Sequence, residues 1–182
     1  MQLSIKPYTY IALSILLFTI PLRWFVCWII AVAFHEICHL IAVKSCGGEI
    51  LSLSIGVGGA EIQCGNMTEK KNLLSVLLGP VGGLLLACFG HWLPGVALCS
   101  FILSVYNLIP VLPMDGGRAL CILFGERKWV YCFQNIMLMI LFVLALLFTF
   151  LMKLGLLPVT IVAILYLKHR KIPCKESFCK VQ

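Results

Sequence analysis

Long apolar runs with few charges are the feature that most constrains what this chain can fold into. Of its 182 residues, 62% are hydrophobic and only 12% are charged, whereas soluble domains carry roughly 25% charged residues. Segments such as Trp24–Val43 and Trp129–Met152 match the roughly 20 apolar residues that a helix needs to cross a bilayer. The sequence therefore predicts an integral membrane protein, with the lipid bilayer as a partner.

About six transmembrane segments are predicted. Besides the two named above, they are Leu73–Phe89, Gly95–Ile109, Tyr8–Ile20 and Leu154–Leu167. The last two are short and cross only part of the bilayer unless flanking residues help. A Pro/Gly break follows Ile109 and precedes a shorter helical piece, Arg118–Phe124.

The segment Glu49–Ile62 has a different period. Leu51, Leu53, Ile55 and Val57 alternate with small polar residues or glycine, and Gly58-Gly59 follows. Alternation with a Gly turn predicts a β-hairpin, which in a membrane protein must lie at the interface or line a cavity inside the protein. The predicted fold class is an all-α polytopic membrane protein with a small membrane-associated β-hairpin. The length allows one compact domain, residues 1–182.

The net charge of +7 does not indicate nucleic-acid binding, because no basic residues interleave with aromatic ones in the manner that binds bases. Six spans would place both termini on one side of the membrane. The basic residues on that side are Lys6, Lys44, Lys70, Lys71, Arg127, Lys128, Lys168, Arg170, Lys171, Lys175 and Lys180. The opposite side holds Arg23 and Lys153. Because positive residues favour the cytoplasm, both termini are predicted to be cytoplasmic.

Residues 35–39 read H-E-I-C-H, an H-E-x-x-H motif placed over halfway along the predicted helix Trp24–Val43. Two histidines four residues apart stand on one helix face and can share a zinc ion. Glu36, beside the first histidine, can take a proton from the attacking water. Ionisable groups at this depth are costly unless they are paired, metal-bound or facing water. The alternative is two histidines that hydrogen-bond between helices, beside an unrelated glutamate.

A zinc site needs a third protein ligand, and Asp115 is the only aspartate in the chain. It lies in Asn107–Gly117, NLIPVLPMDGG, whose prolines and glycines should break the helix. Broken helices at membrane depth are tolerated where they line a buried or wet cavity. Asp115 is therefore predicted to join His35 and His39 as a ligand. An ordinary N-terminal cap of Arg118–Phe124 is its alternative or additional role.

The early H-E-x-x-H and the late N-x-x-P-x-x-P-x-D-G together resemble the site-2 protease family of intramembrane zinc metalloproteases, within peptidase family M50. The resemblance runs roughly from the first helix to Phe124. Leu78-Gly79-Pro80 is similar to the family's Gly-Pro element, and the hairpin resembles its membrane-associated strands. Cys38 departs from the family's usual glycine. A thiolate there could join the metal and silence the enzyme.

The resemblance implies a zinc metalloendopeptidase that hydrolyses peptide bonds in or near transmembrane segments of membrane-anchored protein substrates, in regulated intramembrane proteolysis. It implies one Zn²⁺ per chain on His35, His39 and Asp115, with Glu36 as catalytic base. Asn107 would hold the substrate or polarise the scissile carbonyl.

Too few residues separate the two motifs for a PDZ domain, and the tail leaves no room for a C-terminal regulatory domain. What remains resembles the compact branch of the family, which includes the sporulation protease that releases a membrane-held sigma-factor precursor. This branch implies a multi-pass protein of a bacterial cell membrane, with a membrane regulator protein as a further candidate partner.

Two rival functions remain open. One is a catalytically silent zinc-binding membrane scaffold, for which Cys38 is the only hint. The other is a metal transporter, because intramembrane histidines and carboxylates also mark ion paths. Transporters often have repeated halves with matched broken helices, whereas this sequence has one zinc motif, one break and no evident repeat.

Other reactive side chains have ordinary explanations. His91 follows a predicted helix end and is predicted to be interfacial, and His169 lies among Lys and Arg and is predicted to be solvated. Six of the ten cysteines lie in or beside apolar runs and are predicted to be reduced and to behave like small hydrophobic residues. They are Cys27, Cys38, Cys88, Cys99, Cys121 and Cys132, and the prediction concerns their reduced state and apolar character rather than their burial.

The charge asymmetry predicts the orientation of the chain. A reporter enzyme that is active only outside the cytoplasm should stay inactive when fused after Gln182, and a cytoplasmic reporter should be active there. Strong activity of the external reporter at Gln182 would show that the orientation is reversed.

Overall fold

The computed structural model describes residues 2–5, 7–56, 59–65, 67–125, 127–152 and 157–171. The chain forms two compact units that divide between Asn107 and Leu108. We call the described residues up to Asn107 the N-terminal unit and those from Leu108 onward the C-terminal unit.

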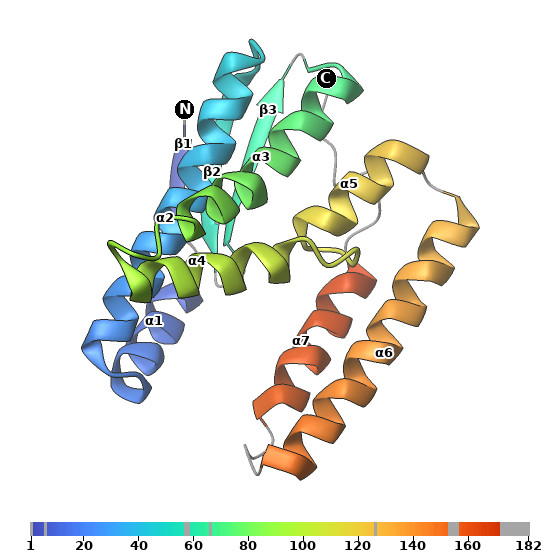
Figure 1. Cartoon of the computed structure of the whole chain (residues 1–182). Helices are drawn as coiled ribbons and strands as arrows, with labels where there is room; N and C mark the ends of the chain where they lie inside the picture. The colour runs from blue at the N-terminus through green and yellow to red at the C-terminus, as the bar shows by residue number, and fades with distance from the viewer. Residues whose placement is uncertain are drawn as a thin grey trace. The chain divides into compact units, whose positions relative to one another are not determined.

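The N-terminal unit combines four helices with a small sheet (Figure 1). In chain order its elements are β1 (Gln2–Ile5), α1 (Pro7–Thr19), α2 (Leu22–Ser45), β2 (Glu49–Gly56), β3 (Gly59–Gly65), α3 (Glu69–Ala87) and α4 (Pro94–Asn107). Helices α2, α3 and α4 pack against one another. Ser100 of α4 donates a hydrogen bond to the carbonyl of Gly83 in α3 at 2.8 Å. Small residues thus bring these helices close, as is common between membrane helices.

Local sequence explains where α2 begins and ends. Pro21 precedes its first turn, where a missing backbone N–H is harmless. At the other end Gly47 adopts a φ of 75°, and the amide of Gly48 donates to the carbonyl of Val43 at 2.9 Å. A left-handed glycine that returns hydrogen bonds to the last turn is a common way to end a helix.

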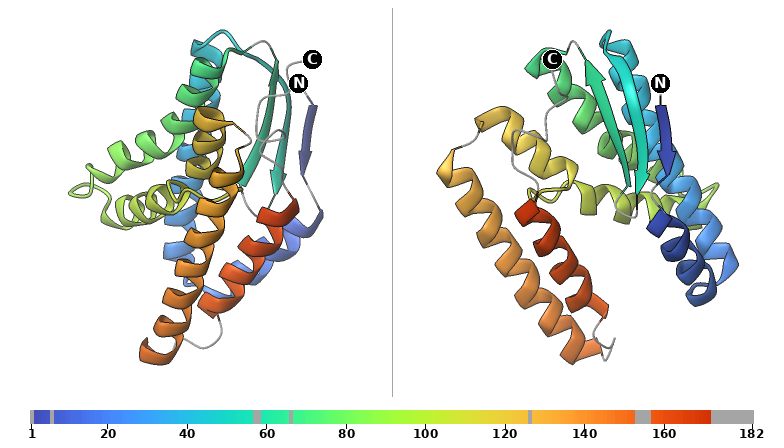
Figure 2. Two further views of the ribbon diagram at one scale, coloured as in Figure 1. Left: turned by 90° about the vertical axis from the view of Figure 1, so that its right-hand side faces the viewer. Right: turned by 180° about the vertical axis from the view of Figure 1, so that it is seen from behind.

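The sheet has three strands in the order β1-β2-β3, visible beside α2 and α3 in Figure 2. Strand β2 pairs with β3 antiparallel, with Leu53 opposite Ile62, which confirms the predicted hairpin. Strand β1 pairs with β2 in parallel, and the sequence analysis did not predict this strand. Its four residues are too few to show a period of two.

One end of the hairpin departs from the alternation seen in the sequence. A register shift between Ile50 and Ser52 inserts Leu51 as an extra residue and leaves its side chain 50% exposed. Ile50 instead packs, with Ile62, on the cluster of Val43, Cys64 and Met67. A bulge changes which side chains face inward, and a strict alternation does not reveal it. Val57, predicted at the end of the alternating strand, and Gly58 of the predicted Gly58-Gly59 turn lie outside the described residues, whereas Gly59 begins β3.

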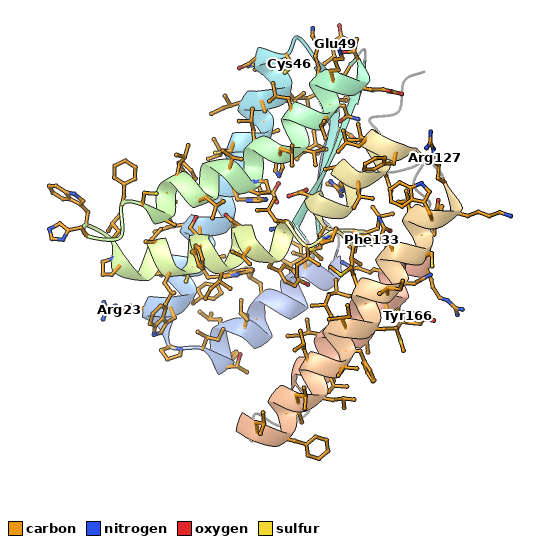
Figure 3. The ribbon with its side chains drawn as sticks, turned by 45° about the vertical axis from the view of Figure 1, so that its right-hand side comes forward. Arg23, Cys46, Glu49, Arg127, Phe133 and Tyr166 are labelled. Carbon is orange, nitrogen blue, oxygen red and sulfur yellow. The ribbon has the colours of Figure 1, made fainter. Side chains whose placement is uncertain are left out.

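The C-terminal unit contains α5 (Asp115–Phe124), α6 (Lys128–Met152) and α7 (Leu157–Lys171). Helices α6 and α7 run side by side as an antiparallel hairpin (Figures 1 and 2). The core of the C-terminal unit contains Leu112, Cys121 and Val130, which are fully buried. Figure 3 shows Arg127 where α5 gives way to α6, and Tyr166 on α7.

Each predicted membrane segment corresponds to a helix, but the count of six spans is not confirmed. Among the described residues, three helices are long and apolar enough to cross a membrane: Leu22–Ser45, Glu69–Ala87 and Lys128–Leu151. Helix α4 is apolar but shorter, and α1 and α7 have 13 and 15 residues. Large apolar side chains of α6, such as Phe150 at 78% exposed, suit contact with lipid rather than water.

The cysteine prediction needs one correction. Cys27, Cys38, Cys88, Cys99 and Cys132 are free thiols, as predicted. Cys121 is instead disulfide-bonded, as is Cys64. Cys121 is fully buried in the core of the C-terminal unit, so burial in an apolar run did not distinguish a bonded cysteine from a free one.

Candidate metal centre

The two motif histidines lie one helical turn apart on the buried face of α2. His35 is 3% exposed and His39 is 9% exposed. Their Nε2 atoms are 3.2 Å apart, and their rings meet edge to face at 82°. Two nitrogen ligands at about 2.0–2.1 Å from a tetrahedral zinc lie roughly 3.4 Å apart. The pair therefore has the spacing that a shared metal ion requires.

A hydrogen bond from the neighbouring helix orients His39. Its Nδ1 lies 2.8 Å from the backbone carbonyl of Ser75 in α3. A carbonyl oxygen can only accept, so Nδ1 carries the proton and Nε2 keeps its lone pair. Metal-binding histidines commonly use such a bond to fix the ring and its tautomer. Ser75 was not singled out in the sequence, although it lies one turn before Gly79.

Gly79 leaves the space that His39 occupies. A Cβ at this position of α3 would overlap the His39 imidazole, with Nε2 as its nearest atom. The element Leu78-Gly79-Pro80 therefore has a steric role: it lets α3 pass close to α2 at the histidine ring. Both Gly79 and Pro80 are buried.

The thiol of Cys38 faces α3 as well. Its Sγ is the atom that a Cβ at Gly82 would overlap. Cys38 thus fills the small space opposite a glycine. The packing against Gly82 explains why a side chain larger than glycine fits at position 38. It does not require the Cys38 thiol to bind a metal.

The remaining residues predicted for the N-terminal unit lie near its surface. Glu36 follows His35 in α2 and is half-buried. Asn107 is the last residue of α4, and its Nδ2 donates to the carbonyl of Leu103 at 3.0 Å. Asn107 therefore stays a predicted site residue whose amide is partly engaged within its own helix.

In the C-terminal unit, Asp115 is the first residue of α5 and is 6% exposed. Met114 occupies the cap position, with no side-chain cap hydrogen bond, so Asp115 does not serve as the N-cap considered from the sequence. One oxygen of Asp115 lies 4.0 Å from the Arg118 guanidinium. A carboxylate in the first turn is also favoured by the helix dipole.

Two glycines after Asp115 allow the proline-containing loop to fold back on α5. A Cβ at Gly116 would overlap the carbonyl of Leu108, and one at Gly117 would overlap the backbone of Val111. The D-G-G sequence is thus required by close backbone packing, which holds the start of α5 against residues 108–112.

The described residues provide a candidate set of metal ligands in His35, His39 and Asp115. All three are buried, and each offers one ligand atom: two imidazole nitrogens from α2 and one carboxylate oxygen from α5. These are the donor types that a catalytic zinc site uses, with a fourth position left for water.

The chain is similar to a known peptidase family and to a solved structure. Residues 81–148 match the family model described as peptidase family M50. A solved structure, the site-2 protease from Methanocaldococcus jannaschii, matches with a TM-score of 0.64 at 21% identity, over 94% of this chain and 91% of that one. No curated protein matches the chain significantly.

The fold is thus similar to that of the solved site-2 protease. The family match and the structural likeness together support membership of the site-2 protease family within peptidase family M50, as the two sequence motifs predicted.

The space beside His39 generates a prediction. Gly79→Ala should lower the zinc content of the purified protein and destabilise it by about 1–3 kcal/mol, because the added methyl displaces the imidazole or separates the helices. Gly90→Ala is the matched control, since a Cβ there would meet its neighbours at 3.4 Å or more. Metal analysis and thermal unfolding measure both effects. Equal zinc content in the two variants would contradict the steric role of Gly79.

Proposed function

We propose that this protein is an intramembrane zinc metalloprotease of the site-2 type, which hydrolyses peptide bonds in or near the transmembrane segments of membrane-anchored proteins. The observation that carries the proposal is the histidine pair of α2, with Nε2 atoms 3.2 Å apart and one ring oriented by the Ser75 carbonyl. The tautomer fixed by Ser75 leaves the lone pair on Nε2 of His39, the nitrogen that lies beside Nε2 of His35, as a shared metal ion requires.

One zinc ion would be held by His35, His39 and Asp115. The support for Asp115 is chemical. It is the only aspartate in the chain, it is 6% exposed, and it is kept at a helix start by the glycines that follow it. A buried carboxylate in a membrane protein is costly unless a cation neutralises it.

The chain's own residues would supply the proton transfers. When bound, zinc polarises the scissile carbonyl and lowers the pKa of water toward about 7. Glu36 accepts a proton from the attacking water and passes it to the leaving amine, so that one carboxylate serves first as base and then as acid. The half-buried position of Glu36 suits a group that must reach a substrate.

Asn107 would help to hold the substrate or polarise the scissile carbonyl. Its amide nitrogen carries two hydrogens, and the bond to the Leu103 carbonyl uses only one of them. The second can be donated to a substrate without breaking the end of α4.

The sheet would capture the substrate. A transmembrane helix hides its carbonyls in hydrogen bonds, so it must unwind before hydrolysis, and an unwound strand can pair with an open sheet edge. Because β2 is central in the order β1-β2-β3, its edge is not open. Within the described residues, β1 and β3 each have an outer edge with no paired strand. We propose β3 for this role because it belongs to the hairpin and is the longer of the two, with seven residues against four.

The rival functions have less support. The scaffold hypothesis rested on a Cys38 thiolate that joins the metal, and Cys38 instead packs at Gly82. The transporter hypothesis requires matched broken helices, and the sequence has one Pro/Gly break of this kind, between α4 and α5.

The proposed location is a cell membrane, bacterial if the compact branch applies, with both termini in the cytoplasm. The proposed partners are a membrane-anchored substrate and, as in that branch, a membrane regulator.

Two variants separate metal binding from catalysis. Glu36→Gln should keep one zinc per chain and lose about 10²–10⁴-fold in cleavage, because it removes a general base while leaving the ligands intact. Asp115→Ala should lose both zinc and cleavage. Metal analysis and comparison of membrane-protein fragments in cells with either variant or the unaltered enzyme provide the readouts.

Each outcome has a clear consequence. Full cleavage by Glu36→Gln would show that Glu36 is not the general base, and absence of cleavage by the unaltered protein would favour a scaffold or a transporter. Full zinc content and activity in Asp115→Ala would show that another residue is the third ligand.

The edge of β3 can be tested with proline. Neighbouring residues of a strand point their N–H groups to opposite sides. Of the two variants Glu61→Pro and Ile62→Pro, one therefore removes a hydrogen bond to β2, and the other removes an N–H donor at the free edge of β3. The variant that keeps zinc and stability should lower cleavage at least about tenfold if substrate pairs there. Unchanged cleavage in that variant would make the sheet a structural element only.

A further inference from the structure

A groove between α6 and α7 is not used by the proposed proteolysis. One cavity of about 890 Å³ is lined by residues of these two helices. A second, of about 750 Å³, extends along α6. The two share Tyr131, Asn135 and Met139 in their walls. We refer to the pair as the α6–α7 groove.

The groove is polar at one end and apolar along the rest. Because the helices are antiparallel (Figure 2), the start of α6 lies beside the end of α7. Lys128 and Asn135 line it from the first turns of α6, and Arg170 from the last turn of α7. Farther along the helices the walls are apolar, with Phe142 and Val162 among them. Among the described lining residues there is no aspartate or glutamate, so the polar end attracts anions.

A buried histidine at this end has an unmet hydrogen-bonding atom. The prediction that His169 is solvated was wrong: it is 7% exposed and lines the groove. Its imidazole donates a hydrogen bond to the backbone of Leu112, whereas its Nδ1 is buried with no partner among the described residues. Burial lowers the pKa of His169, and the bond to Leu112 offsets part of this. The ring is therefore neutral near pH 7, and Nδ1 is an acceptor.

We propose that the α6–α7 groove binds one anionic phospholipid with a hydroxylated head group, of the phosphatidylglycerol type. The phosphate lies against Arg170 and Lys128, a head-group hydroxyl donates to Nδ1 of His169, and an acyl chain follows the apolar wall at Leu138 and Phe142. Arginine suits the phosphate because its guanidinium presents several donors in one plane. The guanidinium carbon of Arg170 lies over the Tyr166 ring, 5.3 Å from the ring centroid.

Two further observations favour a lipid over a protein helix. Basic pockets between membrane helices at the cytoplasmic side bind anionic head groups, and the charge pattern predicts this side for Lys128 and Arg170. A helix would need small residues to approach closely, whereas the walls contain Met139, Phe142 and Tyr166.

The test uses the purified full-length protein and non-denaturing mass spectrometry, with phosphatidylglycerol and phosphatidylcholine of identical acyl chains added in turn. The unaltered protein should retain one phosphatidylglycerol per chain about tenfold more tightly than phosphatidylcholine. Arg170→Gln should abolish this difference, since one charge-assisted hydrogen bond accounts for about tenfold in affinity. Arg127→Gln is the matched control: it removes the same charge at the same end, from an exposed residue outside the groove's described lining.

A second variant tests the hydroxyl contact. His169→Phe keeps a ring but removes the acceptor, so it should weaken phosphatidylglycerol about tenfold and leave phosphatidylmethanol, an anionic phosphodiester without a hydroxyl, nearly unchanged. Zinc content serves as the measure of folding for every variant and does not depend on cleavage, so this test can fail while the protease proposal stands.

Several results would overturn the lipid site. Equal losses in Arg127→Gln and Arg170→Gln would reduce the effect to general surface charge. If the unaltered protein retained phosphatidylcholine as tightly as phosphatidylglycerol, the groove would not recognise the head group. A groove variant could also leave lipid retention unaltered but change the self-association of the protein or the amount of substrate bound to it. That result would assign the groove to a protein helix instead.

Discussion

The hydrogen bond between Nδ1 of His39 and the Ser75 carbonyl, at 2.8 Å, is the contact on which the candidate metal centre depends. It fixes which nitrogen of the ring is free to bind a metal, and it joins α2 to α3. The bond can form only because Gly79 leaves room for the imidazole one turn along α3. A single pair of helices thus determines the position, the rotation and the protonation of a ligand.

The same helix pair shows why small residues are concentrated in α3. Gly79 accommodates His39, Gly82 accommodates Cys38, and Gly83 accommodates Ser104. Helices in a membrane gain little from burying apolar surface against each other, so close approach of their backbones supplies much of the packing energy. In this protein, that close approach also places a polar site inside an apolar layer, where a poorly positioned histidine or carboxylate would find no water to compensate for it.

The C-terminal unit handles polar groups differently. Asp115 is held at a helix start by a loop that packs on Gly116 and Gly117, and Gln134 is fully buried while its amide contacts the Gly117 carbonyl at 3.4 Å. His169 is also buried, and among the described residues both its Nδ1 and the Oε1 of Gln134 have no hydrogen-bond partner; of these two atoms, only that of His169 belongs to a residue that lines the groove. Buried polar atoms without partners are rare because each loses its hydration, which is why His169 and the groove beside it indicate a ligand. A bound lipid would give the proposed protease a means to sense the membrane that its substrates share.

The sequence alone determined the membrane setting and the positions of the helices, because hydropathy is a local property of a helix. It also predicted His35, Glu36 and His39 from their spacing, and Asp115 because a sole aspartate inside an apolar region has few ordinary explanations, and these roles stay proposals. Tertiary structure decided what depends on contacts between distant segments: Ser75 as the partner of His39, the small space that Cys38 fills, strand β1 beside β2, the bulge at Leu51 and the burial of His169. None of these follows from local pattern, since packing between elements, and not the period of any one of them, sets which atoms meet.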